Sequence, residues 1–304
     1  MRIFVGFGEY PHTVAALRAV GATIVSSISE AEGFVFTQTP GTDFPALPPE
    51  IRWVQLPSAG INDYFADGHI TPDRRWSNAS GAYGRQVAEA AIALLLGLLH
   101  KHPTMVRADS WAPRAHVDAT TSWLDGTTVA IIGGGGIGRE LATMLRPFGA
   151  RSLAVTRSGE PHELFDATLS ISELHTALRT SDHVIVAVPL TDATRRLFSD
   201  AEFNAMKPQA HLINVARGEV VDTDALVRAL DASSISGAGL DVTDPEPLPD
   251  GHPLWGRDNV IITPHTANTL ASMDEMLAPV VAENYQRFIA GERMLTEVDV
   301  EKGY

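Results

Sequence analysis

The chain has 304 residues, of which 44% are hydrophobic and 20% are charged. This composition is typical of a globular protein, and the length is enough for two domains of ~100–200 residues each. Lysine and arginine total 23 against 37 aspartate and glutamate residues, so the formal net charge is −14. Because such an acidic surface repels phosphate backbones and anionic lipid, we expect no nucleic-acid partner and no membrane partner.

Cysteine is absent from the sequence. Its absence excludes disulfides, thiolate catalysis, iron–sulfur clusters and cysteine-bound zinc, and we expect no metal site. The longest apolar run, Ala90–Leu99, has about half of the ~20 residues that span a bilayer. The N-terminal stretch MRIFVGFGEY is too short in apolar residues for a secretory signal. These features predict a soluble, cytoplasmic protein.

The N-terminal third of the chain alternates short apolar runs with amphipathic stretches. Strands are predicted at Ile3–Val5, Thr23–Val25, Phe34–Phe36 and Trp53–Gln55, and a helix at Thr13–Val20. This alternation predicts a mostly parallel sheet with helices on its faces. A further helix, Gln86–Leu99, is apolar on nearly every face, which predicts a buried position between two layers or two domains. We expect Pro103 to end it.

The same alternation restarts at Thr127. Strands are predicted at Val129–Ile132, Leu153–Thr156, His183–Val188, Leu212–Asn214, Gly237–Leu240 and Val260–Thr263. Helices are predicted at Ile137–Arg146, Ile171–Leu178, Asp200–Ala205 and Thr223–Leu230. A long amphipathic helix follows at about Asn268–Ala290. We expect this last helix to return and pack on the first domain.

The segment VAIIGGGGIGREL carries a glycine-rich turn between a predicted strand and a predicted helix. In a dinucleotide site, Gly133 makes the tight turn, Gly135 lets the backbone approach a pyrophosphate, and Gly138 allows close helix–strand packing. The N-terminus of the helix then offers N–H groups to the phosphates. The pattern favours a dinucleotide, while a sharp turn without a ligand and a methyltransferase-type site stay open.

The end of the next predicted strand indicates which dinucleotide is bound. A carboxylate usually stands there in NAD-specific sites, where it accepts hydrogen bonds from the ribose. Here the position eighteen residues after Gly138 is Thr156, followed by Arg157 and Ser158. A guanidinium and two hydroxyls can hold a 2′-phosphate by charge-assisted hydrogen bonds. The sequence therefore predicts NADP(H), with NAD as the alternative.

Three polar clusters, NVARG, LDVTDPEP and TPHTA, each follow a predicted strand. They contain Arg217, Glu246 and His265. Ligand sites of open α/β sheets gather outside the carboxyl ends of the strands, so these side chains are expected to converge on the bound nicotinamide. Each residue alone is more often structural, but together they form an acid–base and anion-binding set.

The order of GGGGIG, VPLTDATRRLF, INVARGEVVD, LDVTDPEPLP, HPLW and ITPHTA resembles the D-isomer-specific 2-hydroxyacid dehydrogenases. The segments LPSAGIND and VAEAAIALLL are also similar to family elements. The resemblance implies an α/β fold of two doubly wound parallel-sheet domains, usually in a homodimer. A Rossmann cofactor domain, residues 100–269, would be inserted into a flavodoxin-like substrate domain of residues 1–99 and 270–304, with the active site between them.

The resemblance also implies roles for individual residues. Arg217 would bind the substrate carboxylate and carbonyl, His265 would donate or accept the proton, and Glu246 would be its partner. The backbone of Ser58, Ala59 and Gly60 would close on the substrate carboxylate. The implied cofactor-binding residues are Gly133, Gly135, Gly136, Ile137, Gly138, Thr156, Arg157, Ser158, Pro189, Ala216 and Asp241.

Two positions depart from the common family pattern. Gly136 stands where many members carry a basic residue, and Thr156–Ser158 replaces the usual acidic strand end. The second departure resembles the NADPH-preferring glyoxylate and hydroxypyruvate reductases of the family. We therefore predict hydride transfer between NADP(H) and a small 2-keto or D-2-hydroxy acid.

Several alternatives stay open. The sequence does not identify the side chain of the keto acid, so a phosphoglycerate dehydrogenase-like enzyme or another NAD-dependent member is retained. A formate-oxidising enzyme would have no use for the pair of Glu246 and His265, because its substrate needs no proton transfer. A regulator that senses NAD(P) on the same fold without turnover is the alternative outside enzymes.

Overall fold

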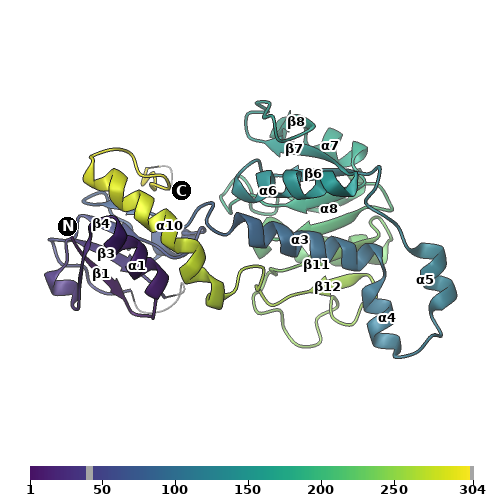
Figure 1. The fold of residues 1–304 in the computed structure, drawn as a ribbon. Helices are drawn as coiled ribbons and strands as arrows, with labels where there is room; N and C mark the ends of the chain where they lie inside the picture. Colours follow the sequence, from purple (N-terminus) through teal and green to yellow (C-terminus); the bar gives the residue numbers. More distant parts are fainter. Residues whose placement is uncertain (39–43, 302–304) are drawn as a thin grey trace. The chain divides into compact units, whose positions relative to one another are not determined.

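A computed structural model of the chain describes residues 1–38 and 44–301 (Figure 1). It divides into two compact units. The first unit consists of Met1–Tyr83 and Asn268–Tyr304, and the second of Gly84–Ala267. Across the described residues, none of the helices combines the length and the apolar composition that a membrane span requires.

The first unit is built on a sheet of five parallel strands. The strands are β1 (Arg2–Gly6), β2 (Thr23–Val25), β3 (Gly33–Phe36), β4 (Trp53–Gln55) and β5 (Arg75–Ser77). Their order, β2-β1-β3-β4-β5, is the flavodoxin-like order, which confirms the predicted fold. Strand β5 was not predicted, because its three residues, RWS, show no apolar pattern.

Helices cover both faces of this sheet. They are α1 (Pro11–Ala19), α2 (Asn62–Ala66) and α10 (Leu270–Ile289), and a 3₁₀ turn, η1 (Ile28–Glu30), lies between β2 and β3. On one face, Phe34, Phe36 and Trp76 form a core with Tyr64 of α2. On the other face α10 packs against α1, and its Asp274 accepts hydrogen bonds from the first N–H groups of that helix (2.7 and 2.8 Å).

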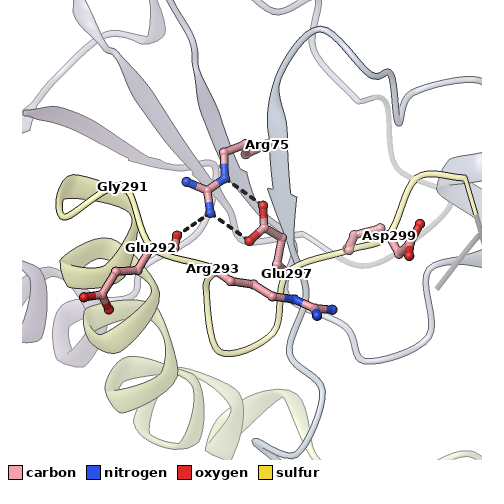
Figure 2. A pocket seen from close by; sticks show the side chains of 7 residues that line it. Arg75, Gly291, Glu292, Arg293, Glu297 and Asp299 are labelled. Carbon is pink, nitrogen blue, oxygen red and sulfur yellow. Dashed lines mark hydrogen bonds and ion pairs between the residues drawn. The ribbon is translucent and has the colours of Figure 1, made fainter.

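The segment after α10 runs antiparallel to β5 and is fixed to it by an ion pair (Figure 2). The Arg75 guanidinium donates to both carboxylate oxygens of Glu297, each at 2.7 Å, and to the backbone carbonyl of Glu292. The guanidinium also lies over the ring of Phe288, 5.3 Å from its centroid. An open cavity of about 420 Å³ lies here, and no predicted site residue lines it.

The second unit is built on a sheet of seven parallel strands in the order β12-β11-β10-β9-β6-β7-β8. They are β6 (Thr128–Ile132), β7 (Arg151–Thr156), β8 (Ala167–Ser170), β9 (His183–Val186), β10 (His211–Asn214), β11 (Gly237–Leu240) and β12 (Val260–Ile262). This is the Rossmann order with a seventh strand at one edge, which confirms the predicted cofactor fold. Strand β8 was missed because this edge strand is half exposed and carries little apolar pattern.

The helices of this unit are α3 (Gly84–Leu99), α4 (His102–Ala108), α5 (Arg114–Thr120), α6 (Gly136–Leu145), α7 (Leu174–Thr180), α8 (Asp200–Ala205) and α9 (Thr223–Asp231). Short 3₁₀ turns are η2 (Arg146–Phe148), η3 (Ile171–Glu173) and η4 (Gly218–Val220). Helix α3 ends before Pro103, but that proline lies in the first turn of α4, where its fixed φ favours a helix start.

The predicted domain boundaries differ from those of the structure. We expected residues 1–99 and 270–304 in one domain and 100–269 in the other, whereas the chain divides after residues 83 and 267. The reason is α3, which packs on β10, β11, β12 and α6. A Cβ atom on Gly239 of β11 would lie 2.9 Å from the Cβ of Leu94, so the helix approaches the sheet closely. The apolar helix therefore covers the second sheet.

Candidate active site

The glycine-rich turn joins β6 to α6. Gly133 has a φ of +119°, and a Cβ there would lie 2.5 Å from the carbonyl oxygen of Ala187. A Cβ on Gly138 would collide with the carbonyl oxygen of Gly133. Both positions therefore require glycine, the first for its backbone angle and the second for close helix–strand packing.

The turn fits a bound phosphate. Gly135 precedes α6, and a Cβ built on it would meet no atom within 4 Å. No side chain caps the helix, whose first residues are Gly136 and Ile137. The open space therefore lies at a helix N-terminus, where N–H groups and the helix dipole favour an anion. These residues suit the pyrophosphate of a dinucleotide.

The end of β7 lies against this turn. A Cβ on Gly134 would be 2.7 Å from Cγ2 of Thr156. The hydroxyl of Thr156 accepts from the Gly159 N–H at 3.0 Å, while Arg157 and Ser158 are exposed. Pro189, also exposed, follows β9 in the same sheet. The structure thus places the predicted cofactor residues that follow β6, β7 and β9 at the carboxyl ends of these neighbouring strands.

Arg217 lies three residues beyond the end of β10. The side chain of Asn214 holds the loop backbone at two points. Its Oδ1 accepts from the Ala216 N–H (3.1 Å), and its Nδ2 donates to the Arg217 carbonyl (3.0 Å). Nη1 of Arg217 donates to the Ala216 carbonyl at 2.8 Å. A Cβ on Gly218 would overlap the carbonyl of Thr243, so this loop lies against the segment that leads to Glu246.

Glu246 and His265 form a direct pair. The Glu246 Oε1 lies 2.7 Å from Nδ1 of His265, and the two side chains are 43% and 45% exposed. Nε2 of His265 has no hydrogen-bond partner in the part of the chain that the structure describes. With Nδ1 engaged by the carboxylate, Nε2 is the nitrogen that can exchange a proton with a ligand.

Asp241 anchors the loop that carries His265. Its carboxylate is buried and accepts from the hydroxyl of Thr263 (2.6 Å) and from the N–H groups of Thr266 (2.9 Å) and Ala267 (3.1 Å to each oxygen). The Asp241 carbonyl also accepts from the His265 N–H at 2.8 Å. The sequence analysis missed this structural role, because nothing in LDVTDPEP indicates that the first carboxylate is buried.

Ser58, Ala59 and Gly60 follow β4 in the first unit. The carbonyl groups of residues 57–60 accept hydrogen bonds from Tyr83 Oη (2.7 Å), Ala79 N (3.0 Å), Asn78 Nδ2 (3.1 Å) and Ser58 Oγ (2.8 Å), in that order. The N–H groups of Ala59 and Gly60 have no acceptor among residues 1–38 and 44–301. A loop with its carbonyls engaged and adjacent N–H groups open suits a carboxylate. The sequence analysis did not identify the supporting residues Asn78 and Tyr83.

Comparison with known proteins agrees with this geometry. Residues 90–267 match the family model described as D-isomer specific 2-hydroxyacid dehydrogenase, NAD binding domain. An uncharacterized protein encoded in the proB 3′ region of Corynebacterium melassecola is 44% identical over 303 residues, 98% of this chain and 99% of that protein.

Two further similarities concern characterised or solved proteins. A glyoxylate reductase of Pyrococcus furiosus is 35% identical over 233 residues, 74% of this chain and 69% of that protein. The crystal structure of a D-isomer specific 2-hydroxyacid dehydrogenase from Xanthobacter autotrophicus Py2, in complex with NADPH and MES, aligns with a TM-score of 0.82 at 27% identity. That alignment covers 100% of this chain and 99% of the other.

Proposed function

The chain belongs to the D-isomer-specific 2-hydroxyacid dehydrogenase family, whose members are NAD(P)-dependent oxidoreductases, and we propose that it reduces small 2-keto acids with NADPH. Glyoxylate and hydroxypyruvate are the first candidate substrates. The observation that carries the proposal is the contact of 2.7 Å between Glu246 and His265. These residues, like Arg217 and the glycine-rich turn, follow the carboxyl ends of strands of the same sheet.

NADPH, when bound, supplies the hydride that the reduction of a ketone requires. Arg217 binds the carboxylate and the carbonyl oxygen of the substrate through its planar guanidinium, and the N–H groups of Ala59 and Gly60 bind the carboxylate. His265 donates a proton from Nε2 to the developing alkoxide. Glu246 engages Nδ1 of His265 at 2.7 Å and so leaves Nε2 for this proton.

The preference for NADP(H) over NAD(H) rests on the end of β7. Arg157 and Ser158 are exposed there beside the glycine-rich turn, and residues 156–158 include no carboxylate. A carboxylate would repel a 2′-phosphate, whereas a guanidinium binds it. The similar structure from Xanthobacter autotrophicus, in complex with NADPH, supports the same choice.

The cofactor proposal predicts the effect of Arg157→Ala. The KM for NADPH should rise roughly 10- to 100-fold, because a charge-assisted hydrogen bond to phosphate contributes about 1.5–3 kcal/mol. The KM for NADH should change little. Arg151→Ala is the matched control, since Arg151 is exposed at the opposite end of the same strand. An equal loss with both cofactors contradicts the assignment.

Substrates with an uncharged side chain are favoured over phosphorylated ones. The residues that follow β1, β4 and β5 directly are 7–10, 56–61 and 78–83, and none of them is lysine, arginine or histidine. A substrate phosphate would need a cationic side chain among the residues that follow these strands. This observation favours glyoxylate and hydroxypyruvate over phosphohydroxypyruvate.

A second copy of the chain is the partner we propose, as a homodimer. Helices α4 and α5 bury none of their residues, and Val106 and Trp111 are 79% and 80% exposed. Between residues 101 and 122 three side chains are basic and two are acidic, so this segment lacks the excess of negative charge by which two copies of an acidic chain repel each other. The cytoplasmic location stays a prediction.

The direct test is NADPH oxidation by the purified protein, followed at the nicotinamide absorbance band. Glyoxylate, hydroxypyruvate, pyruvate and phosphohydroxypyruvate are compared at several concentrations. The proposal expects turnover, with phosphohydroxypyruvate the poorest substrate. Binding of NADPH without turnover of any keto acid would favour the alternative of a sensor that does not catalyse.

A further inference from the structure

We propose that Asn78 is a positioning residue that fixes the direction of the substrate-binding N–H groups of Ala59 and Gly60, and that a buried amide network holds Asn78 from the C-terminal part of the chain. The inference rests on the proposed function of the loop Ser58–Gly60. It assigns a role to Gln55, Asn284 and Thr296.

Asn78 follows β5 and is only 8% exposed. Its Nδ2 donates to the carbonyl of Ala59 at 3.1 Å, and its Oδ1 accepts from the N–H of Ser80 at 3.0 Å. Because each amide atom has a partner on a different side, the amide group cannot rotate without losing both hydrogen bonds. The orientation of the side chain is therefore fixed.

Planar peptide groups connect these carbonyl contacts to the N–H groups of the loop. The Ala59 carbonyl and the Gly60 N–H belong to one trans peptide and point in opposite directions. When Asn78 holds the carbonyl, the Gly60 N–H is directed away from Asn78. The Ser58 carbonyl, bound by the Ala79 N–H at 3.0 Å, directs the Ala59 N–H in the same way. The loop thus presents two adjacent donors to an anion.

A network of buried polar side chains holds the backbone of Asn78. Its carbonyl accepts from Nε2 of Gln55 (2.8 Å) and from the hydroxyl of Thr296 (2.6 Å), and its N–H donates to the Thr296 carbonyl (3.1 Å). Nδ2 of Asn284, in α10, donates to Gln55 Oε1 (2.9 Å) and to Thr296 Oγ1 (2.8 Å). Gln55 and Asn284 are each 0% exposed. In this apolar interior, each lost partner would leave a costly unsatisfied group.

The C-terminal segment is held in place independently of this network. The ion pair of Arg75 with Glu297, shown in Figure 2, fixes the residue next to Thr296, and Val298 N donates to the Trp76 carbonyl at 2.9 Å. Thr296 therefore meets Asn78 at a defined position. Positioning of the loop depends on groups more than 200 residues away in sequence.

Asn78→Asp tests the proposal, because it keeps the shape of the side chain but replaces the donor to Ala59 with an acceptor. The KM for glyoxylate and the Kd for oxamate, a keto-acid analogue, should each rise about tenfold or more, as expected for the loss of ~1.4 kcal/mol of binding. The kcat at saturation and the KM for NADPH should change less than twofold. Thr296→Val, one step further from the loop, should raise the same two constants about threefold.

Trp76→Phe is the matched control. Trp76 is buried in β5, and the substitution removes its hydrogen bond of 2.9 Å to the Thr71 carbonyl, which lies outside the network of Gln55, Asn284 and Thr296. All variants are compared by thermal unfolding as well as kinetics. If Trp76→Phe and Thr296→Val lower the Tm alike but only Thr296→Val weakens the binding of oxamate, the effect is positioning and not general destabilisation.

The outcomes separate this inference from the proposed function. If the unmodified enzyme reduces no keto acid, the proposed function fails. If it reduces glyoxylate, but Asn78→Asp and Thr296→Val keep the oxamate Kd and the glyoxylate KM, positioning by Asn78 is refuted while the function stands. Should Asn78→Asp not fold, Thr296→Val decides by the same two constants.

Discussion

Two loops of the molecule are held in opposite ways. The loop of His265 is held through its N–H groups, which donate to the buried carboxylate of Asp241. The loop of Ser58–Gly60 is held through its carbonyl groups, one of which accepts from the buried amide of Asn78. The first loop presents a side chain and the second presents backbone N–H groups.

The difference follows from what each loop offers to a ligand. In a loop that contributes a side chain, the N–H groups are free to donate to an internal acceptor. A charged acceptor makes these hydrogen bonds strong. A loop that contributes N–H groups must leave them open, so a donor has to take its carbonyls instead. The type of the anchoring residue thus indicates which backbone groups remain for binding.

The largest effect is expected where the side chain itself is removed. His265→Ala takes away the proton donor, so kcat/KM for the best keto acid should fall by the ~10²–10⁴-fold typical of general acid catalysis. The Kd for NADPH should change little. His175→Ala is the matched control, because His175 lies 2.9 Å from Glu202 in a second histidine–glutamate pair outside the site. Near-normal activity of His265→Ala would refute the mechanism.

A smaller effect is expected from the anchor of that side chain. Asp241→Asn keeps the shape but places an NH₂ group against donors of the loop, so kcat should fall about 10- to 100-fold through misplacement of His265. The free energy of unfolding should fall by about 1–3 kcal/mol, as buried donors lose their acceptor.

Asp182→Asn provides the comparison for Asp241→Asn. Asp182 also accepts a backbone N–H, from Thr128 at 2.8 Å, and pairs with Lys207 at 2.7 Å, but it lies at the amino ends of the strands. This variant should lose stability and keep its kcat. Equal loss of kcat in both variants would mean that destabilisation alone explains the effect.

The sequence predicted most of the architecture because its motifs are local. Strands Thr23–Val25, Trp53–Gln55 and Gly237–Leu240 were predicted at their observed bounds, since short apolar runs between turn residues define them. Gln86–Leu99 was predicted as a buried helix but assigned to the wrong unit, because a helix that is apolar all round does not indicate which sheet it covers.

The residues that anchor the two loops could not be predicted from the sequence, for a different reason. Arg217, Glu246 and His265 stand in compact motifs whose chemistry is visible in a few letters. Asn78 depends on Asn284 and Thr296, which only the fold brings to it. A buried polar residue has no local pattern that distinguishes it from an exposed one.

The smallest effect on activity is expected at the amino ends of the strands of the second sheet, where His183 and His211 are the first residues of β9 and β10. Both are buried, and their Nδ1 atoms are 3.4 Å apart. Burial lowers the pKa of His183 to about 4 and that of His211 to about 3. Asp182 raises the pKa of His183, whereas Lys207 lowers it. His183 and Lys101 both lower the pKa of His211.

Acid should therefore unfold the protein through this pair. The unfolded histidines bind protons near pH 6.5 and the folded ones only near pH 4 or below, so their contribution to stability is complete above about pH 6.5 and is lost as the pH falls towards 4. The free energy of urea unfolding should fall between pH 7 and pH 5 by roughly 2–4 kcal/mol more than in the double variant His183→Phe/His211→Phe. At pH 7.5 the double variant should keep its kcat, because the pair lies at the amino ends of the strands, whereas Arg217 and His265 follow the carboxyl ends. Parallel pH curves for the two proteins would show that other groups control acid unfolding. A fall in kcat would show that the carboxyl ends of these strands are not independent of their amino ends.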